Sequence, residues 1–235
     1  MGAIYRRELK SYFVSPAAYV FIAVFYMFSG LFFYGTNLGI AVADIPTAIE
    51  GMFQIVLYLI PLITMRVLSE DKKNKTDQAL ITAPIGTMSI VLGKFFATFT
   101  IYLIACGIFL IYALLLAVYA PLAWGTIFAA MLGILLLGAS IISIGVFISG
   151  MTESQVIAAV ITFAVSIGIT FLGFIISVVP DGIFKKIISQ FSFINRFEVF
   201  AQGQINFSHM LFFVSVSALF LYYAAHTIER RKYVA

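Results

Sequence analysis

The chain has 235 residues, of which 63% are hydrophobic and only 10% charged, and its formal net charge is +4. Soluble globular domains carry about 25% charged residues, so this composition excludes a soluble protein and indicates an integral membrane protein. The basic residues lie beside apolar segments and form no stripe on a soluble face, which excludes nucleic acid as a partner.

The N-terminal segment, residues 1–14, combines apolar and charged residues in a pattern typical of an amphipathic helix in a membrane interface. Pro16 then predicts a break in the chain. The first apolar segment, from Ala17 to about Gly39, holds no charged residue. It is longer than the roughly 7 to 15 residues of a signal-peptide core, so we expect a retained span and not a cleaved signal peptide.

Five further apolar segments are long enough, with flanking residues, to cross a hydrocarbon core about 30 Å thick as helices. Their expected bounds are Met52 to Met65, about Phe95 to Tyr119, Gly125 to Ile148, Val156 to Val179, and His209 to about His226. They are continuously apolar, whereas the strands of membrane barrels alternate apolar and polar residues. We therefore predict an all-α integral membrane protein with six transmembrane helices, forming a single domain over residues 1–235.

Six spans place both termini on one side of the membrane. Eleven Lys and Arg residues fall in the N-terminal segment, the 66–94 loop and the C-terminal tail, whereas three fall on the other side. The positive-inside rule therefore predicts that both termini and the 66–94 loop are cytoplasmic. The segment 182–208 is then extracytoplasmic, and because its apolar residues recur at helical spacing we expect short outer helices between spans five and six.

The predicted spans hold no ionisable residue away from their ends. Such a residue costs roughly 2.5 to 3.5 kcal/mol on insertion scales, and ion-coupled carriers use the ones they keep. The nearest candidates fall at predicted span ends: Arg66, Lys94, Glu153, His209 and His226. No metal-ligand spacing surrounds either histidine, so we expect no metal site and no catalytic residue. The stretch from Gly86 to Phe95 fails to match a phosphate-binding loop, so ATP, if it drives the protein, is bound by another chain.

Hydroxyl and small residues within the spans leave two interpretations open. The hydroxyl groups either line a permeation path or bond to their own helix backbone; they are Ser29, Thr36, Tyr58, Thr64, Ser140, Ser143 and Thr170. Small residues allow helices to approach closely, either within the chain or between chains, and they lie at Gly35, Gly39, Gly138, Ser140, Ser143 and Gly145.

Charge is concentrated in one short segment. Six of the chain's 14 basic and ten acidic residues lie between Glu70 and Asp77. Ser69 is placed to cap a helix here, Glu70 and Asp71 suit its positive N-terminus, and Pro84 would end it. The alternative is a solvated loop whose lysines only fix topology.

Four separated parts of the sequence carry a resemblance to a known family: "YRRELKSYFVSPAAYVF", "MRVLSEDKKNKTDQALITAPIGTMSIVLGKFFA", "ESQVIAA", and "INRFEVFAQGQINFSHMLFFVSVSALFL" followed by "ERRKY". They resemble the type-2 ABC exporter permeases and, within them, the gliding-motility-type permease subunits. The resemblance implies an elbow helix at residues 1–14 and a coupling helix at residues 69–83 that docks on a separate ATPase. The family pattern is matched at Glu70, Asp71, Thr76, Leu80, Thr82, Ala83 and Pro84, and it is not matched at Lys75 and Gln78.

The resemblance implies a permease subunit that is not itself an enzyme and binds no cofactor, with ATP and Mg²⁺ bound by an ATP-binding cassette subunit. The residues expected to contact that subunit are Glu70, Asp71, Lys72, Thr76, Gln78 and Leu80. Further implied partners are a second permease copy or a related permease, membrane lipid and a membrane accessory subunit, in the bacterial plasma (inner) membrane. A non-transporting membrane scaffold of a surface machine and a secondary carrier or channel are the alternatives, and the sequence does not identify a substrate.

Overall fold

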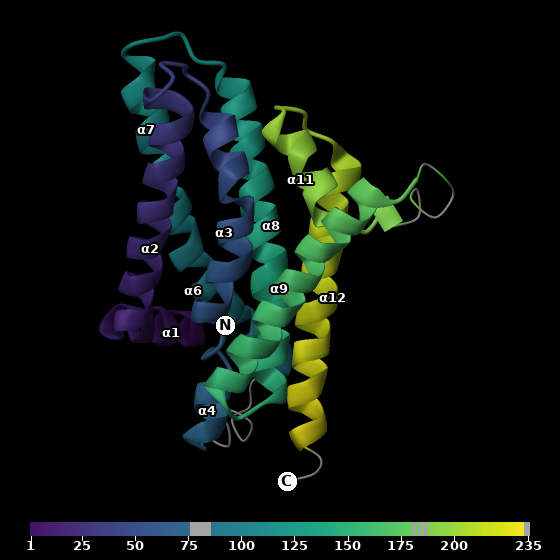
Figure 1. The fold of residues 1–235 in the computed structure, drawn as a ribbon. Helices are drawn as coiled ribbons and strands as arrows, with labels where there is room; N and C mark the ends of the chain where they lie inside the picture. Colours follow the sequence, from purple (N-terminus) through teal and green to yellow (C-terminus); the bar gives the residue numbers. More distant parts are fainter. Residues whose placement is uncertain (76–85, 181, 183–184, 186–187, 233–235) are drawn as a thin grey trace.

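The computed structural model describes residues 1–75, 86–180, 182, 185 and 188–232, and this part of the chain contains helices but no strand (Figure 1). The prediction of an all-α protein is therefore confirmed. The elements are α1 (Gly2–Val14), α2 (Pro16–Phe33), the π-helix η1 (Tyr34–Leu38), α3 (Ile45–Thr64), α4 (Ser69–Lys73), α6 (Thr87–Cys106), α7 (Ile108–Ala117), α8 (Trp124–Met151), α9 (Gln155–Val178), α11 (Phe193–Ala201) and α12 (Phe207–Lys232).

Six helical segments in the described part are long and apolar enough to cross a membrane, which confirms the number of predicted spans and defines a multi-pass membrane protein. They are Pro16–Leu38, Ile45–Lys73, Thr87–Ala117, Trp124–Met151, Gln155–Ile176 and Phe207–Arg230. The largest differences from the expected bounds are in the second and third spans. The second span begins at Ile45 and not at Met52, and the third begins at Thr87 and not at Phe95, so Lys94 lies about two turns inside a span helix.

The breaks between helices have local causes. Ser15 is extended, its Oγ accepts a hydrogen bond from the Ala17 N–H at 3.2 Å, and Pro16 occupies the first turn of α2, where a missing N–H costs nothing. Within the third span, the helix is interrupted at Gly107, whose N–H bonds to the carbonyls of Leu103 and Ile104 before α7 begins. The chain thus turns sharply after α1, and the third span is divided into two parts.

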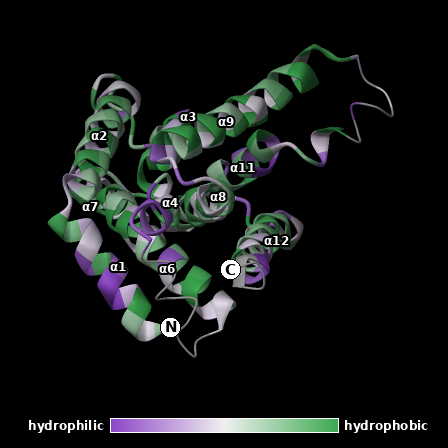
Figure 2. Ribbon diagram, turned by 90° about the horizontal axis from the view of Figure 1, so that it is seen from below, coloured by the Kyte–Doolittle hydropathy of each residue, from purple (hydrophilic) through white to green (hydrophobic). Residues whose placement is uncertain are grey.

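The long helices are packed around α8, which contacts α3, α6, α9, α11 and α12. In an 18-residue apolar stretch of α8, 72% of the residues are buried, whereas in the corresponding stretch of α9 only 22% are buried. Helix α8 is therefore central and α9 peripheral. Figure 1 shows α1 lying crosswise to the long helices, near the end of the bundle where α4 and the last turns of α12 lie, while α11 lies toward the opposite end. Figure 2 shows hydrophilic residues on α1 and α4.

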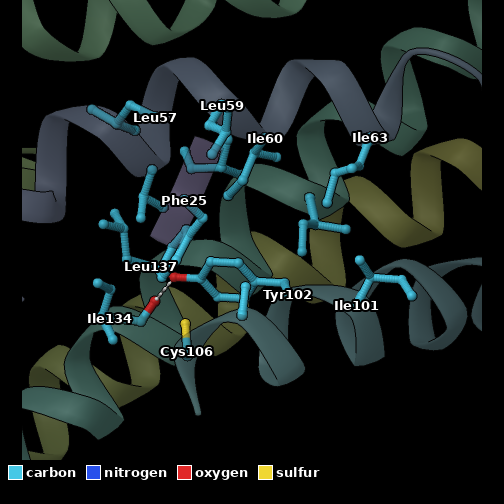
Figure 3. Close-up of a cluster of buried hydrophobic side chains, with 14 of the residues drawn as sticks. Phe25, Leu57, Leu59, Ile60, Ile63, Ile101, Tyr102, Cys106, Ile134 and Leu137 are labelled. Atoms are coloured by element: carbon cyan, nitrogen blue, oxygen red, sulfur yellow. Dashed lines mark hydrogen bonds between the residues drawn. The ribbon is translucent and has the colours of Figure 1, made fainter. Parts of the chain in front are cut away.

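Small residues let α8 approach its neighbours. A Cβ at Gly138 would clash with the ring of Tyr102 on α6, and one at Gly145 would clash with Thr64 on α3. The Tyr102 hydroxyl donates to the Ile134 carbonyl at 2.7 Å, in the buried cluster of Figure 3 that also contains Cys106. Packing within the chain therefore explains Gly138 and Gly145, whereas a Cβ at Gly35 would meet open space.

Most of the span hydroxyls bond to their own helix. Six of the seven lie within hydrogen-bond distance of a carbonyl three or four residues earlier: Ser29, Thr36, Thr64, Ser140, Ser143 and Thr170. Ser140 also donates to the Phe213 carbonyl on α12, at 2.9 Å. The exception is Tyr58, whose hydroxyl lies 3.4 Å from the Thr170 Oγ1. The interpretation as helix-backbone bonds accounts for these six residues without a permeation path.

The segment 182–208 contains helical residues between the last two spans, as expected: residues 185, 188 and 189 lie within the predicted apolar pattern, and a further helix follows it. This helix is α11, and Ser192 caps it by accepting a hydrogen bond from the Asn195 N–H at 3.2 Å. Residues 183, 184, 186 and 187, which carried much of the predicted pattern, lie outside the described residues.

Candidate functional site

Lys94 lies at the point where α1, α4 and α6 meet. Its side chain is 2% exposed, and its Nζ lies 3.0 Å from the Glu8 Oε1 and 2.7 Å from the Asp71 Oδ2. The ammonium group also donates to the Val67 carbonyl at 2.7 Å. One buried cation therefore joins the N-terminal helix, the start of the predicted coupling segment and the third span.

Arg7 completes this group of charges. Its Nη2 lies 3.0 Å from the Glu8 Oε1 and 3.6 Å from the Asp71 Oδ1, so each carboxylate lies between two cations. We refer to Arg7, Glu8, Asp71 and Lys94 as the Lys94 junction. Its formal charges sum to zero, and pairing of this kind is what allows a charged group to be buried.

Arg66, in the turn after α3, binds the C-terminal part of α1. Its guanidinium donates to the Ser11 Oγ at 3.1 Å and to the Ser15 Oγ, and its Nε lies 3.3 Å from the Glu70 Oε2. The guanidinium carbon lies 4.8 Å from the centre of the Tyr12 ring, a cation–π contact. The start of the predicted coupling segment is thus attached to α1 through Glu70 as well as through Asp71.

Tyr12 anchors α1 to the spans without using charge. Its buried hydroxyl donates to the Ile63 carbonyl at 2.8 Å and lies 3.0 Å from the Thr98 Oγ1. Burial raises the pKa of Tyr12 above its ordinary value, which keeps the hydroxyl neutral. This side chain therefore joins α1 to the ends of α3 and α6 as a stable hydrogen-bond donor.

The start of the predicted coupling segment is also anchored on the end of α8. The Ser149 Oγ accepts hydrogen bonds from the N–H groups of Leu68 and Ser69, each at 3.0 Å, and donates to the Met65 carbonyl at 3.1 Å. Lys72 is 8% exposed, and its Nζ donates to the Gly150 carbonyl. A displacement of α4 would therefore also displace the end of α8, in addition to α1 and α6.

The structure describes three of the six residues predicted to contact an ATPase. Glu70, Asp71 and Lys72 lie in α4 and contact Arg66, the Lys94 junction and the end of α8, respectively. The other three, Thr76, Gln78 and Leu80, lie outside the described residues. Contact of this segment with an ATPase stays a prediction.

One expectation about this segment is corrected. Ser69 does not cap α4, because Leu68 occupies the N-cap position and the Ser69 hydroxyl donates backwards to the Met65 carbonyl. The Glu70 N–H bonds to the Arg66 carbonyl at 3.2 Å, so α4 prolongs the end of α3 through a turn and does not begin as a separate helix. Motion of α4 is consequently linked directly to the second span.

Sequence reasoning missed Lys94 because it placed the residue at the cytoplasmic end of a span. Two pairs of polar residues at helical spacing were the available signal: Glu8 with Tyr12, and Lys94 with Thr98. Residues four apart share a helix face, so each pair marks a polar patch on an otherwise apolar side. Among the residues described, no group of three or more His, Cys, Asp or Glu side chains is placed to hold a metal ion.

Six apolar helices and a charged junction at one end define a multi-pass helical membrane protein. A family model described as "ABC-2 family transporter protein" matches residues 47–226, which run from α3 into α12. The chain therefore belongs to the ABC-2 transporter family and is a membrane subunit of an ABC transporter. Such subunits associate with an ATP-binding cassette subunit, usually pair with a permease, and are usually non-catalytic. No curated protein sequence matches the chain.

Proposed function

We propose that this protein is the permease subunit of an ATP-driven exporter in the bacterial plasma (inner) membrane, of the gliding-motility type, with both termini and α4 in the cytoplasm. A separate ATP-binding cassette subunit, which binds ATP and Mg²⁺, docks on the coupling segment 69–83. A second permease copy or a related permease completes the membrane part, with an accessory membrane subunit beside it. Family membership and the uneven distribution of basic residues support this proposal.

The observation that carries the proposal is the Lys94 junction. It ties the start of the coupling segment to α6 through Lys94 and Asp71, which are 2% and 15% exposed, and to α1 through Glu8, which is 14% exposed, with Arg7 on the water-facing side. Separating a buried ion pair leaves uncompensated charge, which costs about 3 to 5 kcal/mol. A force applied to this segment is therefore passed on to the attached helices before the junction separates.

The contacts of α4 give this force a defined route. It continues from α3, and Lys72 and Leu68 attach it to the end of α8, the most buried span. Closure of two ATPase subunits would displace the two coupling segments, and with them α3, α6 and α8 of each permease. We propose that this displacement switches the interface between the permeases and moves substrate outward.

Charge reversal at Glu70 tests docking, because its side chain is 41% exposed and presents a charge to the cytoplasm in this proposal. Glu70→Lys should prevent co-purification of the ATP-binding cassette subunit from detergent. Glu229→Lys is the matched control, since Glu229 is exposed on α12 and lies outside the segment, and it should leave the complex intact.

The proposal fails if the unaltered chain never retains an ATP-binding cassette subunit, or if reversal of both Glu70 and Asp71 leaves the complex unchanged. Measurements on the complex in proteoliposomes then distinguish a transporter from a membrane scaffold. Stimulated ATP hydrolysis with outward movement of cargo supports the exporter, whereas stable association without either supports a membrane scaffold.

A further inference from the structure

Arg196 on α11 is a partly buried cation. Its Nε and Nη2 donate to the Gln190 carbonyl at 2.9 and 2.7 Å, and its Nη1 lies 3.1 Å from the His209 Nδ1. Arg66 and Lys94 each lie within 4 Å of a carboxylate, whereas in the described chain Arg196 has none at that distance. Partial burial lowers the pKa of Arg196, as expected for a cation that has lost water without gaining an anion.

An apolar groove of about 510 Å³ runs between α8, α9 and α12 and reaches the segment before α11. Its wall includes Phe191, Phe193 and Phe212 near α11 and Ile144 and Leu219 farther along the spans. The one hydroxyl in the lining of this described cavity, on Ser215, donates to the Phe212 carbonyl at 2.8 Å. The groove therefore offers apolar contact and no free hydroxyl hydrogen.

The groove and the cation are parts of one feature. The guanidinium carbon of Arg196 lies 4.2 Å from the centre of the Phe212 ring, and Phe212 also lines the groove. Three of the five guanidinium N–H groups are used by Gln190 and His209, so two remain for another acceptor. An unneutralised cation thus lies at the end of an apolar groove on the side of the spans.

We propose that this groove binds one anionic phospholipid from the leaflet at the α11 end, with an acyl chain between α9 and α12 and the phosphate on Arg196. A lipid is the occupant that fits both parts, because the groove lies among membrane-spanning helices and guanidinium matches phosphate in geometry and charge. Moving an acyl chain from bilayer to groove gains no hydrophobic free energy, since both surroundings are apolar. The preference for an anionic lipid must therefore come from Arg196.

Fluorescence quenching by brominated lipids measures this preference. Trp124→Phe removes the only tryptophan of the chain, and Leu219→Trp places one on the groove wall, where the residue is 49% exposed. The protein is reconstituted in vesicles that contain brominated phosphatidylglycerol or brominated phosphatidylcholine at equal mole fraction. Quenching should show a severalfold preference for the anionic lipid.

Arg196→Gln should lower this preference to about equal binding of the two lipids, and Arg196→Lys, which keeps the charge, should retain part of it. Arg230→Gln is the matched control, because Arg230 also contacts a histidine, His226 at 3.1 Å, at the other end of α12. It should leave the preference unchanged. Val165→Phe, which fills the groove, should weaken quenching by both lipids.

Equal quenching by the two lipids before any change at Arg196 would overturn the proposal, as would a preference that survives Arg196→Gln. Failure of both lipids to quench would also overturn it and would indicate that a helix of a partner protein covers the groove. The assay needs neither an ATPase nor transport, so its outcome is independent of the proposed exporter function.

Discussion

Replacing Lys94 with Met removes the central charge of the Lys94 junction while keeping a side chain of similar length. Glu8 and Asp71 are 14% and 15% exposed, so the change leaves two carboxylates close together with little access to water. Removing one partner of a buried ion pair costs about 3 to 5 kcal/mol, and the partial exposure of the acids and the remaining Arg7 favour the lower value. We expect a loss of about 3 kcal/mol in the free energy of unfolding.

Thermal unfolding of the purified protein in detergent, followed by circular dichroism, measures this loss. For a chain of this size, 1 kcal/mol corresponds to roughly 2 to 4 °C, so the unfolding midpoint should fall by about 6 to 12 °C. Lys10→Met is the matched control, since Lys10 is exposed on α1 and its loss should cost less than about 0.5 kcal/mol.

A second substitution distinguishes lost pairing from lost packing. If the cost comes from unpaired carboxylates, adding Glu8→Gln to Lys94→Met should restore part of the midpoint, whereas Glu8→Gln alone should lower it. The reasoning is refuted if Lys94→Met shifts the midpoint no more than Lys10→Met does, or if the effects of the two junction changes simply add.

Three further outcomes follow from the packing and charges of other helices. Gly138→Ala should lower the unfolding midpoint by the equivalent of about 1 to 3 kcal/mol because its Cβ would overpack the core, whereas Gly168→Ala, with nothing within 4 Å of its Cβ, should be neutral or slightly stabilising. Burial and the nearby Glu50 raise the pKa of Glu198 above its ordinary 4.5. The folded protein thus holds the Glu198 proton more tightly than the unfolded chain, so the stability of the protein should fall as pH rises above about 4.5. In Glu198→Gln the unfolding midpoint, measured against pH, should no longer show this fall. Arg66→Ala should loosen α1, seen as faster motion of a nitroxide label at position 10 by electron paramagnetic resonance.

The spans were predictable because a lipid environment imposes length and apolarity on each helix, and both are properties of a single segment. Because every span is apolar, the sequence does not indicate which helix lies at the centre of the bundle. The sequences of α8 and α9 are both mostly apolar and hold no charged residue, yet α8 is mostly buried and α9 mostly exposed. In water an exposed face would carry charged and polar residues, whereas a face exposed to lipid stays apolar, so overall apolarity does not tell which of the two helices is buried.

The candidate site was predictable in position but not in its contacts. Clustered charge located α4, which holds Glu70, Asp71 and Lys72, and the family pattern matched the first two of these residues. The partners of these residues come from α1, the Arg66 turn and α8, which are distant in sequence, and pattern alone carries no information on such pairs. Lys94 was assigned to a span end because counting apolar residues treats a charge as a boundary, whereas a charge paired by two acids is tolerated inside a span helix.

The position of Lys94 in the chain also bears on how the protein is made. Glu8 and Asp71 precede Lys94 in the sequence, so the ribosome has synthesised both acids before the lysine reaches the membrane. The third span can therefore insert when Glu8 and Asp71, the partners of Lys94, are already at the membrane surface. Helix α1 does not cross the membrane, but it supplies one of these two partners. Loss of α1 should accordingly expose a newly made chain to degradation at the stage when its third span is inserted.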